Sequence, residues 1–491
     1  MSPLDVFALF FGASLAAVAA NGLGRKVGAT KIPAYIVTIA LAVALALVLP
    51  MEPCKYQLPS FAGIPVAELR MDDASRIFSA AAILLGFLAA IYSLKYMEGE
   101  EGVGLYYLLL LLMVAGIVGV TLANDLFTLY CFWELMSVAA YALVAFRWWD
   151  WEPVEAGLKY LVMSTLGALM ALYAISLVYG ASGTTNFDEL RGLLPKLESR
   201  EALGLLVGLF VFGFGVTTAI VPFHTWLPDA HPAAPSPVSA MLSGVVIETG
   251  VYAIARTLFY VLPPLAGIEY LLTYVGLLTC TVGNLSALRQ SDVKRLLAYS
   301  SVANIGYIMV GLGEGYMGLL QGVSTLALAG LAGATLHVVI HAFGKGLLFL
   351  CAGSAIRALK SRSIRDLEGC ARSMPVTGFS AAVGLLNLAG IPPLAGFWSK
   401  LLIAYGLAVT IQNPLMALAL LFFVANAVLA AAYYLTLLTR LFGGKETGAR
   451  EAPPHMWVPE LVLAAACILM TLQLSHVLAL VYRSASALLG W

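Results

Sequence analysis

The 491-residue sequence has few charged residues: Asp, Glu, Lys and Arg make up 11% of it, against about a quarter in an ordinary soluble domain. Apolar and aromatic residues account for 61%, and the mean hydropathy is +0.91. A soluble chain of this length divides into domains and keeps a polar surface. Basic and acidic residues number 27 each, so the basic surplus of a nucleic-acid-binding protein is missing. The composition excludes a soluble enzyme, a nucleic-acid binder and a disordered protein, and it indicates a polytopic membrane protein.

Cysteine is also scarce, with six residues in no C-x-x-C spacing and with no neighbouring His–Cys cluster. The sequence contains no nucleotide-binding loop, haem signature or iron–sulfur cysteine set. We therefore predict no metal site, no cofactor and no catalytic redox residue in this chain. Any redox chemistry must reside in partner subunits.

Long apolar runs, rather than alternating ten-residue strands, predict an all-α membrane protein. Charged clusters, prolines and glycines divide the chain into about 14 segments that are long enough to span a bilayer. The first seven are predicted at 4–22, 32–50, 76–94, 104–123, 126–146, 156–179 and 202–224. The other seven are predicted at 236–262, 266–288, 294–313, 319–356, 376–409, 415–441 and 457–484.

Basic residues predict the orientation of these spans. Of the 27 lysines and arginines, 16 fall in the odd-numbered loops and eight in the even-numbered loops and outer ends. The positive-inside rule then places the odd-numbered loops in the cytoplasm and both termini outside. The remaining three, Lys159, Lys345 and Lys400, lie inside apolar runs. A charge at that depth persists where it is paired, lines a wet cavity or carries an ion.

Two predicted spans are interrupted by proline. Pro222 stands in V-P-F-H-T-W, and Pro392 and Pro393 stand in G-I-P-P-L-A-G-F-W-S-K. Each interruption frees backbone groups, which is tolerated only beside protein or water. Paired broken helices in corresponding halves are typical of inverted-repeat transporters with ion sites at mid-membrane. A packing kink is the alternative interpretation, and it is weaker for two such breaks than for one.

Acidic residues inside the apolar runs are candidates for carrying protons. Glu134 in F-W-E-L-M-S is flanked by apolar residues, and a carboxyl there can take up and release a proton. Glu248 in V-V-I-E-T-G-V is a lone acid in mid-span, with Gly244 and Gly250 allowing close helix approach. Lys159 follows Glu155 at a spacing of four residues, which suits a structural ion pair as well as a transport role.

His337, His341 and Lys345 recur every four residues and therefore lie along one helical stripe. Imidazole titrates near neutral pH, so such a stripe suits proton relay. Zinc binding is disfavoured because H-E-x-x-H and an acidic third ligand are missing. Lys400 follows the second proline break. Together with Glu134 and Glu248, these residues predict a row of titratable groups for lateral proton conduction.

Several motifs carry a resemblance to a known family: N-D-L-F-T-L-Y-C-F-W-E-L-M-S, V-P-F-H-T-W-L-P-D-A, S-D-V-K-R-L-L-A-Y-S-S, H-A-F-G-K-G-L-L-F-L and G-I-P-P-L-A-G-F-W-S-K. Over roughly residues 70–445 the chain resembles the antiporter-like subunits of respiratory complex I, multisubunit Na+/H+ antiporters and membrane-bound hydrogenases. The resemblance implies 14 transmembrane helices with two inverted five-helix repeats. It divides the chain into N-terminal helices 1–3 (1–103), a first repeat (104–262), a second repeat (263–441) and a C-terminal helix (442–491).

The resemblance also implies roles for individual residues. The family's fifth-helix glutamate falls on Glu134, its central relay on the stripe His337–Lys345, and its last-channel lysine on Lys400. This chain departs from the family at Thr217 and Glu248, where lysines are usual. Either Glu248 replaces the lysine as a proton carrier, or the first half does not conduct.

The resemblance implies a proton- or cation/proton-translocating membrane subunit of a redox-driven complex in a prokaryotic plasma membrane. Its implied partners are other membrane subunits and an iron–sulfur, nickel–iron or quinone module, with protons and possibly Na+ as the transported ions. Two alternatives stay open: a subunit of a multisubunit Na+/H+ antiporter without a redox partner, and a partly inactive spacer subunit.

Overall fold

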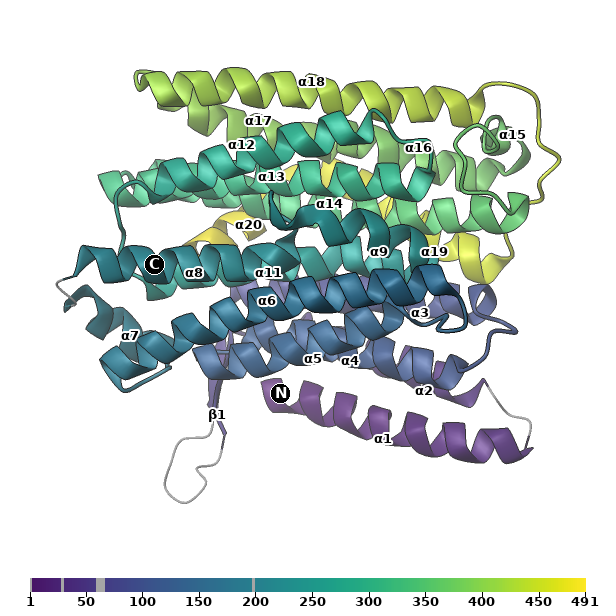
Figure 1. The fold of residues 1–491 in the computed structure, drawn as a ribbon, viewed down its shortest axis with the longest axis horizontal. Coiled ribbons are helices and arrows are strands. Elements are labelled where there is room, and N and C mark those ends of the chain that lie inside the picture. The colour runs from purple at the N-terminus through teal and green to yellow at the C-terminus, as the bar shows by residue number, and fades with distance from the viewer. Residues whose placement is uncertain (1, 28–30, 59–66, 197–198) are drawn as a thin grey trace.

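The structure is a computed structural model that describes residues 2–27, 31–58, 67–196 and 199–491. Its long helices run roughly parallel to one another, and most connections lie at the two ends of the bundle (Figure 1). The first helices are α1 (Pro3–Val27), α2 (Ile32–Val48), α3 (Asp73–Tyr96), α4 (Val103–Leu122), α5 (Leu126–Val144), α6 (Trp151–Ser182) and α7 (Phe187–Leu193). A small antiparallel hairpin of β1 (Cys54–Gln57) and β2 (Glu68–Met71) pairs Cys54 with Met71 between α2 and α3.

The second part of the chain contains long helices and shorter ones between them. They are α8 (Arg200–Thr218), α9 (Leu227–Ala233), α10 (Ser236–Met241), α11 (Ile247–Ala255), α12 (Ile268–Ala287), α13 (Val293–Gln321) and α14 (Ser324–Leu359). The last helices are α15 (Cys370–Ser373), α16 (Pro375–Ala389), α17 (Ala395–Val409), α18 (Pro414–Phe442), α19 (Pro454–Leu472) and α20 (Leu474–Leu489). Two short 3-10 helices, η1 (Leu194–Lys196) and η2 (Phe223–Trp226), and two π-helical stretches, η3 (Leu242–Val246) and η4 (Arg256–Val261), complete the set.

The predicted architecture of about 14 membrane spans is confirmed. Within the described ranges, 12 helical stretches are long and apolar enough to cross a membrane, and α2 and the pair α16/α17 provide two more. The last span was predicted as one helix over 457–484. The structure instead has two helices, α19 and α20, which meet at Gln473.

Both predicted helix breaks are present. The α8 helix ends at Thr218, and the chain passes through Ala219, in a left-handed conformation, and Pro222 before η2 and α9. The freed groups are bonded by neutral donors and acceptors: the Val221 N–H donates to Thr279 Oγ1 (3.1 Å), and the Trp226 indole donates to the Val216 carbonyl (2.8 Å).

The second break separates α16 from α17 at Gly390–Leu394, where Gly390 has a positive φ and Pro392 precedes Pro393. Here the carbonyls left free by the break accept from a cation. The Lys400 ammonium donates to Leu388 O (2.9 Å) and Ala389 O (3.3 Å). Both helices are therefore interrupted at proline, but only the second break has a lysine bonded to its free carbonyls.

The eighth span runs without interruption from Ser236 to Val261 but is not a simple α-helix. It contains the π-helical stretches η3 and η4, which the apolar pattern does not reveal. A π-helical turn inserts an extra residue and shifts the face that the following residues present, and such turns are frequent at functional sites. Glu248 stands in the first turn of α11, directly after η3.

A buried ion pair fixes this span to its neighbours near one end of the bundle. Arg256, 2% exposed, donates through Nη2 to both carboxylate oxygens of Asp72 (2.9 and 2.8 Å), the N-cap of α3. Its Nη1 contacts the Ala487 carbonyl near the end of α20 (3.4 Å). Burial raises the pKa of Asp72, but the charges of Arg256 and Arg70 and the Ser75 amide outweigh burial, so the net pKa lies below its ordinary value. The pair therefore joins three separate parts of the chain.

We expect Asp72→Asn to destabilise the protein by about 3–5 kcal/mol, because it leaves the Arg256 charge buried without a partner. Asparagine still caps a helix well, so the substitution tests the ion pair rather than the cap. Because the folded pKa of Asp72 is lowered, the pair stabilises the protein above the unfolded pKa and loses its effect as pH falls through the folded value. Thermal unfolding of the detergent-purified protein as a function of pH measures both effects.

The control is the neighbouring Asp73→Asn. Asp73 pairs with the partly exposed Arg76, and such a pair contributes about 0–1 kcal/mol. Equal losses of stability in the two variants would contradict a special role for the Asp72–Arg256 pair.

Candidate functional site

The candidate site is built around α14, which spans 36 residues and so about 54 Å. His337, His341 and Lys345 lie along one stripe of this helix, and the exposed fraction of each is 0%. The stripe predicted from the four-residue spacing therefore faces the interior of the bundle. The three members bond to residues of α11, α13 and α17.

Glu248 of α11 bonds to the middle member of the stripe. Its Oε1 lies 2.5 Å from His341 Nδ1, and both side chains are buried. Glu248 Oε2 and His341 Nε2 have no hydrogen-bond partner among the described residues. The close approach depends on Gly244, where a Cβ would stand 2.9 Å from the Ala342 carbonyl. Each of the two residues therefore has one polar atom available for a further hydrogen bond.

His337 connects α14 with α13 and α17. Its Nε2 lies 3.0 Å from Asn304 Oδ1, and its Nδ1 lies 2.8 Å from Ser399 Oγ. Asn304 Nδ2 faces Tyr434 and the Ser300 carbonyl, so its Oδ1 is the acceptor toward His337. His337 Nε2 therefore donates to Asn304. The Ser399 hydroxyl also lies 3.1 Å from the Gly396 carbonyl, so it can give its one proton either to that carbonyl or to His337 Nδ1.

The side chains of Lys345 and Lys400 contact no carboxylate among the described residues. The Lys345 ammonium donates to Leu297 O (2.9 Å) and to the Ser300 hydroxyl, and it lies 5.5 Å from the centre of the Tyr434 ring. The Lys400 ammonium, which caps the second break, lies 4.9 Å from the centre of the Tyr307 ring. Aromatic faces stabilise a cation without neutralising it, and hydroxyl or carbonyl groups lie within hydrogen-bond reach of each lysine.

The structure brings together five of the predicted site residues around α14: Glu248, His337, His341, Lys345 and Lys400. We call this set the polar axis. The other two predicted residues lie apart from it. Glu134 on α5 is half-buried, and its Oε1 has no partner among the described residues. Lys159 near the start of α6 pairs with Glu155 (2.9 Å) and Asp229 (3.0 Å), with 49% of its side chain exposed.

Several residues of the site escaped the sequence analysis. The partners Ser300, Asn304, Ser399, Tyr307 and Tyr434 are polar groups within apolar helices, and such groups are common enough that spacing alone does not single them out. Two buried acids were also missed. One of them, Glu460 on α19, accepts from Ser354 (2.5 Å) and Thr377 (2.9 Å) and so joins α19 to α14 and α16.

The other missed acid is Glu314 on α13. It is 2% exposed, and neither of its carboxyl oxygens has a hydrogen-bond partner among the described residues. A lone acid in a glycine-rich segment, G-L-G-E-G, resembles a helix end in sequence, which hid its position inside a long helix. Its surroundings are taken up below.

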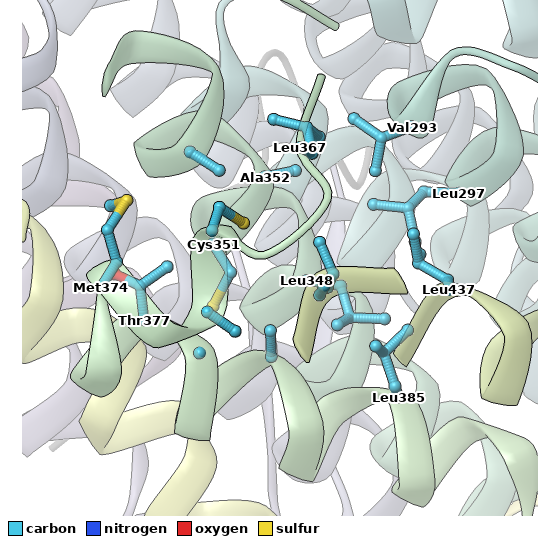
Figure 2. A pocket seen from close by; sticks show the side chains of 16 residues that line it. Val293, Leu297, Leu348, Cys351, Ala352, Leu367, Met374, Thr377, Leu385 and Leu437 are labelled. Carbon is cyan, nitrogen blue, oxygen red and sulfur yellow. The ribbon is translucent and has the colours of Figure 1, made fainter. Parts of the chain in front are cut away.

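An apolar cavity of about 30 Å³ lies between α13, α14, α16 and α18 (Figure 2). Leu297, whose carbonyl accepts from Lys345, lines it together with Leu348, Cys351, Met374 and Leu437. A water molecule there would find few of the polar partners that buried water needs. The cavity therefore does not offer a hydrated route through this part of the bundle.

The fold and the polar axis define a class: polytopic membrane subunits with two broken helices and buried ionisable residues between them. The family model described as NADH:quinone oxidoreductase/Mrp antiporter, TM matches residues 123–430, well over half of the chain. The chain belongs to this family, as the motifs predicted.

Individual relatives support the assignment along most of the chain. NADH-quinone oxidoreductase subunit N of Desulforudis audaxviator is 32% identical over 453 residues, covering 88% of this chain and 87% of the relative. Hydrogenase-4 component B of Escherichia coli is 33% identical over 427 residues, covering 83% of this chain and 62% of the relative. A chain of the archaeal membrane-bound sulfane sulfur reductase superposes with a TM-score of 0.87 at 26% identity, covering 99% of this chain and 98% of that one. These relatives are subunits of multisubunit membrane complexes.

We expect Gly244→Ala to lower the unfolding free energy by about 1–3 kcal/mol, because the added methyl group overpacks the contact with Ala342 and Leu85 beside the Glu248–His341 bond. The measurement is thermal unfolding of the purified protein in detergent. Gly208→Ala on α8 is the control, since no heavy atom outside its own helix lies within 4 Å of its Cβ position. A Gly244 variant as stable as the Gly208 variant would mean that the close contact tolerates a larger residue.

Proposed function

We propose that this protein conducts protons along the polar axis, as a membrane subunit of an ion-translocating complex in a prokaryotic plasma membrane. The observation that carries the proposal is the hydrogen bond between Glu248 and His341, in line with His337 and its bond to Ser399, the residue before Lys400. Titratable groups of three helices thereby follow one another through the interior of the bundle. Intramembrane ionisable residues of this kind mark ion pathways.

The chemistry of each group supports a stepwise transfer. A protonated Glu248 can give its proton to His341, because imidazole accepts at one ring nitrogen and releases from the other. His337 repeats this exchange one turn away, where Asn304 and Ser399 orient its ring. Lys345 and Lys400 hold protons on ammonium groups without a neutralising carboxylate. A proton leaving either lysine therefore removes an uncompensated buried charge.

The contact between Glu248 and His341 also bears on the missing family lysine. Thr217 is buried at the end of α8, directly before the first break, and brings no charge to it. Glu248, which stands where another family lysine is usual, bonds to the relay stripe itself. This geometry favours the explanation in which Glu248 carries protons over the one in which the first half is inactive.

We further propose that the complex is redox-driven and that this chain contributes only the ion path. The relatives include a quinone oxidoreductase subunit and a hydrogenase component, and the sequence of this chain contains no redox motif. The family description also names Mrp antiporters, so a cation/proton antiporter subunit is the second candidate. The two candidates differ in their partners and in their need for sodium.

We expect Glu248→Gln and Lys400→Met each to lower proton transport by about tenfold or more, equivalent to at least 1.4 kcal/mol of barrier. Glutamine keeps the shape of Glu248 but carries no exchangeable acid proton, and methionine keeps most of the volume of Lys400 without its charge. The assay is substrate-driven quenching of a pH-sensitive dye in vesicles that contain the purified complex. Glu201→Gln and Lys196→Met, at exposed positions, are the matched controls.

Normal transport in both variants would contradict the proposal that the polar axis conducts protons. Loss with Lys400→Met but not with Glu248→Gln would leave the second half as the conducting part and return the first half to a supporting role. The same assay with Glu134→Gln tests whether the half-buried acid on α5 belongs to the path.

The partners decide between the two candidate functions. We expect extraction of the native complex in mild detergent, followed by mass spectrometry, to recover an iron–sulfur or nickel–iron module with this chain. Recovery of small membrane subunits alone, together with sodium-dependent transport, would favour the antiporter.

A further inference from the structure

Glu314 lies on the face of α13 that packs against α17. A Cβ added at Gly406 of α17 would stand 2.1 Å from Glu314 Oε2, so the carboxyl occupies the space that the glycine leaves. It lies against Gly406 and faces the backbone N–H of Leu407, although the two form no hydrogen bond of ordinary geometry. Any larger residue at position 406 would displace it.

The same two helices carry the last group of the polar axis. Lys400 on α17 lies over the ring of Tyr307 on α13. Tyr307 and Glu314 are seven residues apart, so they share one face of α13 and are separated by about 10 Å along it. Lys400 and Gly406 are six residues apart on α17, or about 9 Å. Glu314 therefore lies about two helical turns beyond Lys400 along a single helix–helix interface.

The direction of this step leads away from the cytoplasm. The α13 helix begins at Val293, in the predicted cytoplasmic loop that carries Arg289, and continues through the predicted outer loop at 314–318 to end at Gln321. Glu314 stands two turns before that outer end. The basic-residue count thus places Glu314 between Lys400 and the outer face of the membrane.

The environment of Glu314 argues against a purely structural role. Burying a carboxyl without a hydrogen-bond partner costs several kcal/mol, and each such group requires an explanation. Glu460 and Asp72, by contrast, are fully bonded to hydroxyl groups or to an arginine and serve as ties between helices. Glu314 forms no such side-chain bond among the described residues, although α17 makes room for it with a glycine. An acid kept unbonded and buried next to a proton path is suited to accept and release protons.

We propose that Glu314 is the outward proton-release group of this protein, receiving protons from Lys400 and passing them to the outer face. The proposal rests on the proposed function, that is, on proton conduction through the polar axis. In the transfer, the Lys400 ammonium becomes a neutral amine as the Glu314 carboxylate becomes a carboxylic acid. The acid then returns to the carboxylate as its proton leaves to outside water. One proton enters and one leaves, with no other reactant.

The test uses the complete complex in vesicles, with the variants Glu314→Gln and Gly406→Ala and their double variant. Glutamine removes the acid, and alanine displaces it while leaving it in the chain. We expect each single variant to lose about tenfold in proton transport and the double variant to lose no more than either, because both changes act on one carboxyl. Gly208→Ala and Glu201→Gln are the matched controls and should transport normally.

A second readout separates proton transfer from packing. The infrared difference spectrum between driven and resting complex should contain a carboxylic acid C=O band that disappears in Glu314→Gln. If that variant does not assemble, Gly406→Ala still gives a shifted band and the transport loss.

The outcomes distinguish this inference from the proposed function. Wild-type transport in Glu314→Gln, with loss in Lys400→Met, would overturn the role of Glu314 and leave the polar axis intact. No proton transport by the wild-type complex would overturn the proposed function itself. A loss confined to sodium-containing medium would overturn proton release and make Glu314 a cation ligand.

Discussion

The cost of placing ionisable side chains in a membrane governs this structure. A charge at the bilayer centre costs about 2.5–3.5 kcal/mol on insertion scales, and most of the polar axis lies on helices long and apolar enough to cross a membrane. The helices meet that cost with partners drawn from far along the sequence: His341 bonds to Glu248, 93 residues away, and His337 to Ser399, 62 residues away. The packing of α11, α13 and α17 around α14 therefore supplies the hydrogen-bond partners of the polar axis.

Glycines and π-helical turns make this solvation possible. Gly244 lets the eighth span approach α14, and η3 shifts the face of the helix just before Glu248. Gly406 admits the Glu314 carboxyl to the surface of α17. At each of these positions a small residue or an irregular turn lies beside an ionisable one. The polar positions therefore depend on neighbours that carry no polar chemistry.

The sequence predicted the elements whose signals are local. The two broken helices followed from Pro222 and Pro392–Pro393, and the stripe on α14 from the spacing of its histidines. The sequence did not predict which helices would provide hydrogen-bond partners for the stripe. A bond such as His337–Asn304 joins two different helices, and no regular spacing in the sequence relates its two residues. The π-helical turn before Glu248 also lacks a marker, since apolar residues continue through it. The division of the last span at Gln473 coincides with polar residues, but no proline or glycine marks it. For Lys159 the local signal was misleading. Its apolar neighbours predicted a position inside the membrane, but it lies near the start of a helix and pairs with Asp229.

The two helix breaks differ in what holds them. Trp226 and Thr279 close the first with neutral hydrogen bonds, whereas the second is closed by the ammonium of Lys400 on the carbonyls of Leu388 and Ala389. Deprotonation of Lys400 would remove a charge-assisted bond from those carbonyls, and such bonds are about twice as strong as neutral ones. The backbone of the second half would thus respond mechanically to each passing proton, and the first half would not. Only the second break would change its backbone hydrogen bonding with the charge of Lys400, whereas the hydrogen bonds of the first break would stay the same.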